Sequence, residues 1–161
     1  MKNWRIEIKW GIIFVVAGLV WVALEKMLGL HSTRIDQQAT LTNLFIIPAV
    51  VIYWLALKEK RTSLGGSISF KQAFISGLVI TLVVTLFTPL QQYITQTLIS
   101  PDYFKNVSAY AVETKMMTSE EAAGYFTLNN YIMQSLVFAP LAGVITSLLV
   151  GWLVSRKKKT A

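Results

Sequence analysis

One stretch of the chain, from Gln72 to Pro101, carries no charged side chain. A helix that crosses a bilayer needs about 20 mainly apolar residues, so this stretch is long enough to span a membrane. Only 14% of the chain is charged, whereas soluble domains have roughly 25% charged residues, and 54% is hydrophobic. The stretch and the composition together indicate an integral membrane protein.

Four weakly charged apolar stretches predict four transmembrane helices, at about 8–30, 39–57, 72–93 and 131–154. The first opens with cations, as a signal peptide does, but it lacks a small-x-small cleavage motif and is expected to remain uncleaved. Pro48 lies near the middle of the second span and predicts a kink there. The expected fold is an all-α integral membrane protein, a single four-helix domain over residues 1–161.

An additional extracytoplasmic helical segment is expected between spans 3 and 4, over about 100–128. Ser100–Asp102 is typical of a helix start, with a capping serine, a proline and an acid in order. The helix that follows, about 101–115, could lie on the membrane surface or fold over the bundle. Thr118 and Glu121 fit a capping box, and the helix beginning there is expected to continue unbroken into the fourth span.

The distribution of cations predicts the orientation of the spans. A cytoplasmic N-terminus places eleven of the fifteen Lys and Arg residues in cytoplasmic segments: Lys2, Arg5, Lys9, Lys58, Lys60, Arg61, Lys71, Arg156, Lys157, Lys158 and Lys159. The outer segments then hold four: Lys26, Arg34, Lys105 and Lys115. This asymmetry satisfies the positive-inside rule, and both termini are expected in the cytoplasm.

Short motifs around spans 3 and 4 resemble those of one known family. They are Phe70–Phe74 with Gly77, Pro101–Phe104, and Thr118–Ala122 with Tyr125 and Phe126. The family consists of small four-span inner-membrane proteins common in Bacteroidota, a domain-of-unknown-function family, and the resemblance covers nearly the whole chain. It implies a multi-pass protein of the bacterial inner membrane and brings no activity, ligand or catalytic residue.

A polar stripe runs along the third span. Its members follow one another at steps of four, three, four and three residues, which places them on one helix face: Thr81, Thr85, Thr88, Gln92 and Thr95. Threonines in membrane helices often bond their own backbone, so the stripe could serve helix packing. It could instead line a hydrated path or a polar cleft, because polar groups avoid lipid. Both readings remain open.

Other candidate residues lie in spans 1 and 4. Glu25 is the best ionisable candidate because charged groups within spans are usually functional, although an interfacial carboxylate can simply be solvated. His31 is expected to be an exposed loop residue. Small residues at every fourth position of span 4 predict a helix-packing face, against this chain or another subunit: Ala139, Gly143, Ser147 and Gly151.

Several kinds of chemistry have no support in this composition. There is no cysteine and only one histidine, so no metal site and no cofactor are expected. The spans lack the nucleophile–base or paired-carboxylate arrangements that intramembrane catalysis needs, so an enzyme is not expected. The basic tail Arg156–Lys159 suits anionic lipid headgroups rather than nucleic acid.

The sequence favours a non-catalytic inner-membrane protein that acts as an accessory or scaffolding subunit of an envelope complex. Its expected partners are the lipid bilayer and a membrane protein or further copies of itself, with no nucleic acid. The alternative is a small transporter, channel or lipid-binding translocator that uses the polar stripe of span 3. Access of water to the stripe distinguishes the two.

Overall fold

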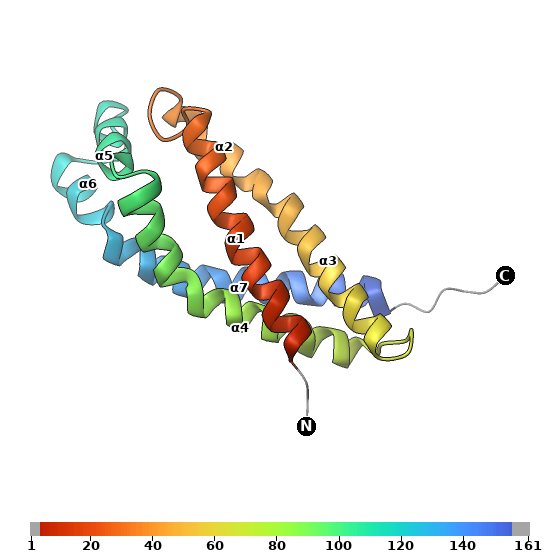
Figure 1. Cartoon of the computed structure of the whole chain (residues 1–161). Coiled ribbons are helices and arrows are strands. Elements are labelled where there is room, and N and C mark those ends of the chain that lie inside the picture. Colours follow the sequence, from red (N-terminus) through yellow and green to blue (C-terminus); the bar gives the residue numbers. More distant parts are fainter. Residues whose placement is uncertain (1–3, 156–161) are drawn as a thin grey trace. The chain divides into compact units, whose positions relative to one another are not determined.

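A computed structural model describes residues 4–155 of the chain, and these form helices joined by short turns, with no strand among them (Figure 1). The elements are α1 (Arg5–Met27), α2 (Ile35–Leu41), the 3-10 helix η1 (Thr42–Phe45), α3 (Ile46–Ser63), α4 (Phe70–Ile94), the π-helix η2 (Thr95–Ile99), α5 (Tyr103–Glu113), α6 (Ser119–Tyr125) and α7 (Leu128–Ser155). Four helical stretches are long and apolar enough to cross a membrane: Arg5–Met27, Ile35–Ser63, Phe70–Ile99 and Leu128–Ser155. The predicted all-α fold with four such helices is confirmed. The predicted basic tail lies outside the described residues.

The chain divides into two compact units, which are described separately. Unit 1 comprises residues up to Val15, Ile46–Leu86 and the chain from Val137 onward. Unit 2 comprises Val16–Phe45 and Phe87–Leu136. Helices α1, α4 and α7 each contribute one part to each unit.

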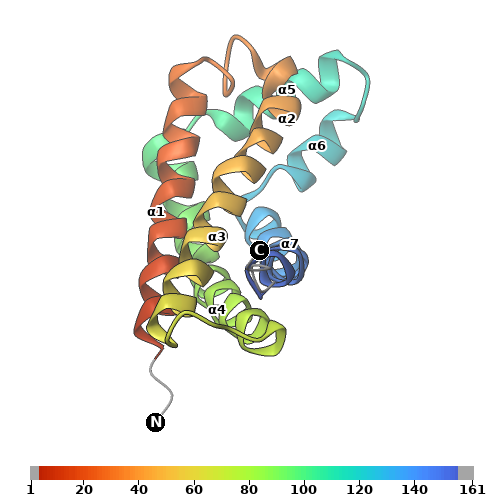
Figure 2. The same cartoon turned by 90° about the vertical axis from the view of Figure 1, so that its right-hand side faces the viewer.

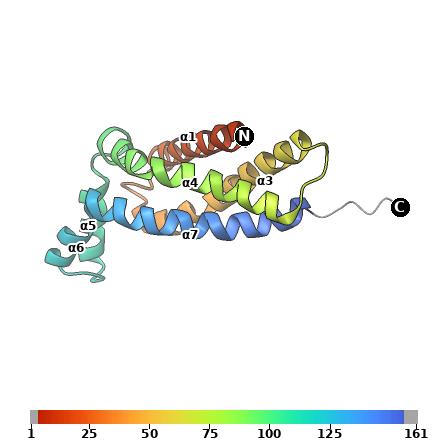
Figure 3. The ribbon, with the colours of Figure 1, turned by 90° about the horizontal axis from the view of Figure 1, so that it is seen from below.

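Unit 1 is a bundle of helices that alternate in direction. The part of α1 in this unit lies beside α3 and runs opposite to it, because Lys9 bonds to Glu59 while the Phe14 ring contacts the Tyr53 ring (Figure 1). Helices α4 and α7 also lie side by side (Figure 3), with Gly77 against Ser147. Antiparallel neighbours are what short connections between successive spans require.

The core of unit 1 consists of apolar side chains contributed by all four helices and the turn before α4. The buried members are Val15, Tyr53, Ala56, Leu57, Ile68, Ala73, Ile80, Val84, Val150 and Val154. Outside this core, large apolar side chains such as Leu86 and Ile145 are 68% and 58% exposed. Exposure of such side chains on a soluble protein would promote aggregation, whereas on membrane-spanning helices it forms the lipid-facing surface.

Unit 2 gathers the turn after α1, the short helix α2 and the helical pair α5–α6 (Figure 2). Helix α5 contacts both α2 and α6. Its Tyr103 and Ala111 are buried. Helix α5 therefore packs on this chain's own residues.

The turn after α1 differs from the prediction. Helix α1 ends at Met27, three residues earlier than the predicted span, and Gly29 reverses the chain with φ +78°. Glycine tolerates this left-handed conformation because it has no Cβ. Helical structure resumes at Ile35, a few residues before the predicted start of the second span.

The prediction that Pro48 kinks the middle of a continuous second helix is wrong. The second span is instead interrupted earlier, at η1, and Pro48 lies in the first turn of α3. A proline costs little there because the first amides of a helix have no intrahelical acceptor. Helices α4 and α7 continue through Pro89 and Pro140.

The predicted capping box at Thr118 is confirmed. Glu121 N donates to the Thr118 hydroxyl at 3.3 Å, and Thr118 N donates to the Glu121 carboxylate at 2.8 Å. These hydrogen bonds hold the pKa of Glu121 below its usual value. The start predicted at Ser100–Asp102 is displaced, because α5 begins at Tyr103 and its N-cap Asp102 makes no side-chain cap.

The prediction that one unbroken helix runs from Thr118 into the fourth span is wrong, because α6 and α7 are separate helices. Asn130 Nδ2 donates to the carbonyl of Gly124 at 2.7 Å, and Asn130 N donates to the Thr127 hydroxyl at 3.3 Å. These bonds satisfy groups at the end of α6 and the start of α7. The break is a local capping effect that neither a charge nor a proline marks.

Candidate functional site

Unit 2 contains a cavity of about 220 Å³. Residues of α1, η1, α4 and the first position of η2 line it: Gly18, Leu19, Trp21, Val22, Thr42, Phe45, Thr88, Gln91, Gln92 and Thr95. The missing side chain of Gly18 makes room for Gln91, whose Nε2 would lie 2.9 Å from a Cβ at this position. A cavity of this size and polarity can hold several waters or a small solute.

Three members of the predicted polar stripe reach this cavity: Thr88, Gln92 and Thr95. Gln92 Nε2 donates to the Ser135 hydroxyl at 2.7 Å, which fixes the amide at the cavity wall. Thr95 lies in η2, and π-helical segments often occur at functional sites. This part of the stripe faces a space that both polar and apolar side chains line.

Thr81, in unit 1, has a different environment. Its side chain is 5% exposed, donates to the carbonyl of Gly77 at 3.0 Å and bonds to the Tyr53 hydroxyl at 2.9 Å. Gly143 packs directly against it. Thr85, between the two regions, is half-buried. Thr81 therefore serves helix packing, whereas Thr88, Gln92 and Thr95 line a cavity.

Glu25 is buried rather than solvated, with 4% of its surface exposed. The Trp21 indole donates to its Oε1 at 2.7 Å, and the Thr42 hydroxyl also bonds to it. Trp21 and Thr42 both line the cavity, so the carboxylate lies immediately behind that wall. The structure thus brings Glu25 close to Thr88, Gln92 and Thr95 of the polar stripe.

His31 is also buried, at 5% exposed, and the prediction of an exposed loop histidine is wrong. Its Nε2 lies 3.3 Å from Glu25 Oε2, and its ring centroid lies 4.9 Å from that of Tyr103. Asn106 donates to its backbone carbonyl at 2.8 Å. The turn at Gly29 and the contact with α5 bury the histidine. Tyr103, which packs against it, is also buried, and this burial raises the pKa of the Tyr103 hydroxyl.

The small-residue face of α7 lies against α4 in unit 1. A Cβ at Gly77 would lie 2.5 Å from Ser147 Oγ, and a Cβ at Gly151 would lie 3.4 Å from Phe74 N. Gly143 packs on Thr81 in the same way, and Ala139 is half-buried. Gly143, Ser147 and Gly151 thus contact this chain's own helix, which leaves less of this face for another subunit.

Glu7 is a candidate that sequence reasoning missed. It is 1% exposed, and its Oε1 accepts a hydrogen bond from the Ser76 hydroxyl at 2.7 Å. The same oxygen forms an ion pair with Lys60 Nζ at 2.8 Å. A signal was present, because steps of four, three, four, three and four residues place six residues on one face of α1: Glu7, Gly11, Phe14, Gly18, Trp21 and Glu25. Both carboxylates of α1 lie on this face.

Within residues 4–155, no group of three or more His, Cys, Asp or Glu side chains is arranged to hold a metal ion. The groups at the cavity are hydroxyls, amides and an indole, with a carboxylate behind them. Such groups bind and orient a polar solute by hydrogen bonds.

The family model described as "Protein of unknown function (DUF4199)" matches residues 9–156. No curated protein and no solved structure matches the chain.

Proposed function

Since this chain belongs to the DUF4199 family of proteins of unknown function, we propose its role from its own geometry: a non-catalytic membrane protein that binds a small polar solute in the cavity of unit 2. The observation that carries this proposal is the convergence of Thr88, Gln92 and Thr95 with the two partners of Glu25 around one cavity. Hydrogen-bonding groups in a membrane helix avoid lipid, so the polar side of this cavity is best occupied by water or by a polar ligand.

The packing of Thr81 favours binding over free passage through an open pore. Four spans enclose little space, and this member of the stripe is buried and hydrogen-bonded within unit 1. A solute that entered the cavity would leave by the same opening unless the helices rearranged. We therefore place the chain among binding proteins or translocators rather than open channels.

The proposed location is the inner membrane of a bacterium, with both termini in the cytoplasm. The described part of unit 1 carries six cations and two acids: Arg5, Lys9, Lys58, Lys60, Arg61 and Lys71, with Glu7 and Glu59. Unit 2 carries four cations and six acids: Lys26, Arg34, Lys105 and Lys115, with Glu25, Asp36, Asp102, Glu113, Glu120 and Glu121. The positive-inside rule assigns the basic unit to the cytoplasmic side.

Single cysteines test the proposal, because the chain has none of its own. Thr88→Cys, Gln92→Cys and Thr95→Cys are expected to react in membranes with a small impermeant methanethiosulfonate reagent. Thr81→Cys is expected to react at least about tenfold more slowly, which corresponds to about 1.4 kcal/mol of additional barrier. Protection of the three cavity cysteines by an added solute would then identify ligands.

Two sets of controls belong to this experiment. Leu86→Cys is a lipid-side control, because Leu86 is 68% exposed on the same helix. Ser119→Cys and Ser67→Cys report orientation, and only the first is expected to react in intact cells whose outer membrane admits the reagent. Equal, slow reaction at Thr81 and at all three cavity positions would mean a dry bundle and would refute the proposed binding role.

A role as an accessory or scaffolding subunit is the second candidate, and the pair α5–α6 favours it. The pair lies outside the spans, and Tyr103 and Asn106 fasten it to the turn at His31. It presents Met116, which is 69% exposed. A helical pair outside the spans, with an exposed apolar side chain in the turn between its two helices, suits contact with a membrane protein or with another copy of this chain.

Site-specific photo-crosslinking in intact membranes tests this second role. A photoreactive residue at Met116 is expected to give a discrete protein adduct of defined mass. The same residue at Leu86 is the matched control, because that side chain faces lipid. A pattern at Met116 that is indistinguishable from the control would count against a subunit role.

A further inference from the structure

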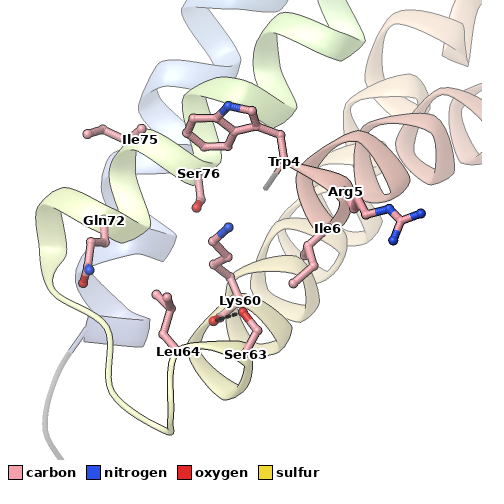
Figure 4. Close-up of a pocket in the computed structure, with 9 residues that line it drawn as sticks. All are labelled: Trp4, Arg5, Ile6, Lys60, Ser63, Leu64, Gln72, Ile75 and Ser76. Atoms are coloured by element: carbon pink, nitrogen blue, oxygen red, sulfur yellow. Dashed lines mark hydrogen bonds between the residues drawn. The ribbon is translucent and has the colours of Figure 1, made fainter. Parts of the chain in front are cut away.

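A second, larger cavity of about 420 Å³ lies within unit 1 (Figure 4). The first turn of α1, the end of α3 and the beginning of α4 surround it. Its apolar walls come from Trp4, Ile6, Leu64 and Ile75, and its polar lining includes Lys60 and Ser76. None of these residues belongs to the cavity of unit 2.

Lys60 is the cation of this cavity. Its side chain is 16% exposed, and its ammonium projects into the space between Ser76 and the Trp4 ring, whereas the Arg5 guanidinium points away (Figure 4). The ammonium lies 5.6 Å from the Trp4 ring centroid. The cavity therefore combines a mostly buried positive charge with aromatic and aliphatic walls.

Glu7 holds the ammonium in this position. Both the Lys60 ammonium and the Ser76 hydroxyl bind its Oε1, and its Oε2 has no hydrogen-bond partner among the described residues. The ion pair is thus made through one carboxylate oxygen rather than two. An ammonium has three N–H donors, so Lys60 can interact with more than one acceptor at a time.

The position of the cavity along the helices indicates where a ligand would come from. Its walls are the ends of three membrane-spanning stretches, which begin at Arg5, end at Ser63 and begin at Phe70. The ends of a span lie at the depth of lipid headgroups, where a phosphate group adjoins the glycerol and the first acyl carbons. The net positive charge of this unit attracts anionic headgroups to the same place.

We propose that this cavity binds the phosphate group of a membrane phospholipid, with the Lys60 ammonium on the phosphate and Trp4, Ile6 and Ile75 against the glycerol and upper acyl chain. Glu7 acts as a positioning residue that orients the ammonium and weakens its hold on the phosphate. The same phosphate chemistry could be presented by a soluble phosphoester, which the experiment separates from lipid. This site is independent of the solute-binding cavity in unit 2.

Native mass spectrometry of the full chain in a non-ionic detergent measures this binding. Phosphatidylglycerol is expected to give a discrete one-lipid adduct, and diacylglycerol, which lacks phosphate, is expected to bind at least about tenfold more weakly. Equal binding of the two would mean that only the apolar walls hold lipid, which would overturn the proposal. Glycerol phosphate is added as a competitor, and complete displacement of lipid by it would assign the site to soluble phosphoesters instead.

Variants assign the adduct to Lys60. Lys60→Gln removes the cation but leaves Glu7 buried without a counter-charge, so the double variant Glu7→Gln with Lys60→Gln is also used to preserve folding. Both variants are expected to bind phosphatidylglycerol about tenfold or more weakly than the unaltered chain does. Lys71→Gln, at an exposed lysine of the same unit, is the control and is expected to bind as the unaltered chain does. Unchanged binding by the double variant would overturn the proposal.

Glu7→Gln alone separates ligand binding from a purely structural role of the pair. The amide keeps the size of the carboxyl group and removes the anion that competes with phosphate. Binding of phosphatidylglycerol is therefore expected to increase, whereas a structural role predicts a loss in this variant as in Lys60→Gln. A loss of binding in Glu7→Gln would refute the contact between Lys60 and phosphate.

Discussion

Lys60→Met lowers the free energy of unfolding by about 3–5 kcal/mol, because it leaves the carboxylate of Glu7 buried without a counter-charge. Glu7 is 1% exposed, and the Ser76 hydroxyl would be its one remaining partner among the described residues. Removing one member of a buried ion pair costs more than the pair contributes, since the other charge cannot return to water. Titration of the purified protein from dodecyl maltoside into SDS micelles measures the loss.

The double variant Glu7→Leu with Lys60→Met tests whether the loss of stability comes from the unpaired carboxylate. It removes both charges and fills the space with apolar side chains, so its stability is expected to return to within about 1–2 kcal/mol of the unaltered chain. Lys71→Met controls for the loss of one lysine at an exposed position. If Lys60→Met proved no less stable than Lys71→Met, Glu7 and Lys60 would not form a buried pair.

Gly143→Leu is expected to destabilise the chain by about 3 kcal/mol or more, through overpacking between α7 and α4. Even a Cβ at this position would collide with the Thr81 side chain. The helices would have to separate, and the hydrogen bond between Thr81 and Tyr53 would be lost with them. The same SDS titration measures the effect.

Ala142→Leu is the matched control, because Ala142 is exposed on the same turn and its variant should be nearly neutral. A second substitution tests whether the contact with Thr81 causes the cost. Thr81→Ala removes two of the three Thr81 atoms that the new Cβ would meet, the hydroxyl and the methyl group, so it should relieve part of the cost of Gly143→Ala. Equal effects of Gly143→Leu and Ala142→Leu would mean that the two helices do not pack closely at this point.

The spans could be predicted because their signal is local. Each requires only a run of apolar residues, and the capping box at Thr118 requires only residues three positions apart. The errors in the helix boundaries also have local causes. The interruption before Pro48 and the break before Leu128 depend on backbone hydrogen bonds that the apolar pattern does not record.

The candidate sites could be predicted only in part. The spacing of Thr88, Gln92 and Thr95 predicts that they share one helix face, but periodicity does not reveal what that face meets. Burial of Glu25 depends on the turn at Gly29 and on contacts with later segments. Glu7 was overlooked because its partner Lys60 is distant in sequence and belongs to another span.

The fastening of α5 to the turn after α1 has a consequence for the order of events during synthesis. Asn106 bonds to the carbonyl of His31 across 75 positions of the sequence. At about 5–20 residues per second, a ribosome needs roughly 4–15 s to make that interval. During that time the buried pair of Glu25 and His31 lacks its cover, and the nascent chain depends on lipid, water or an insertion factor to accommodate it.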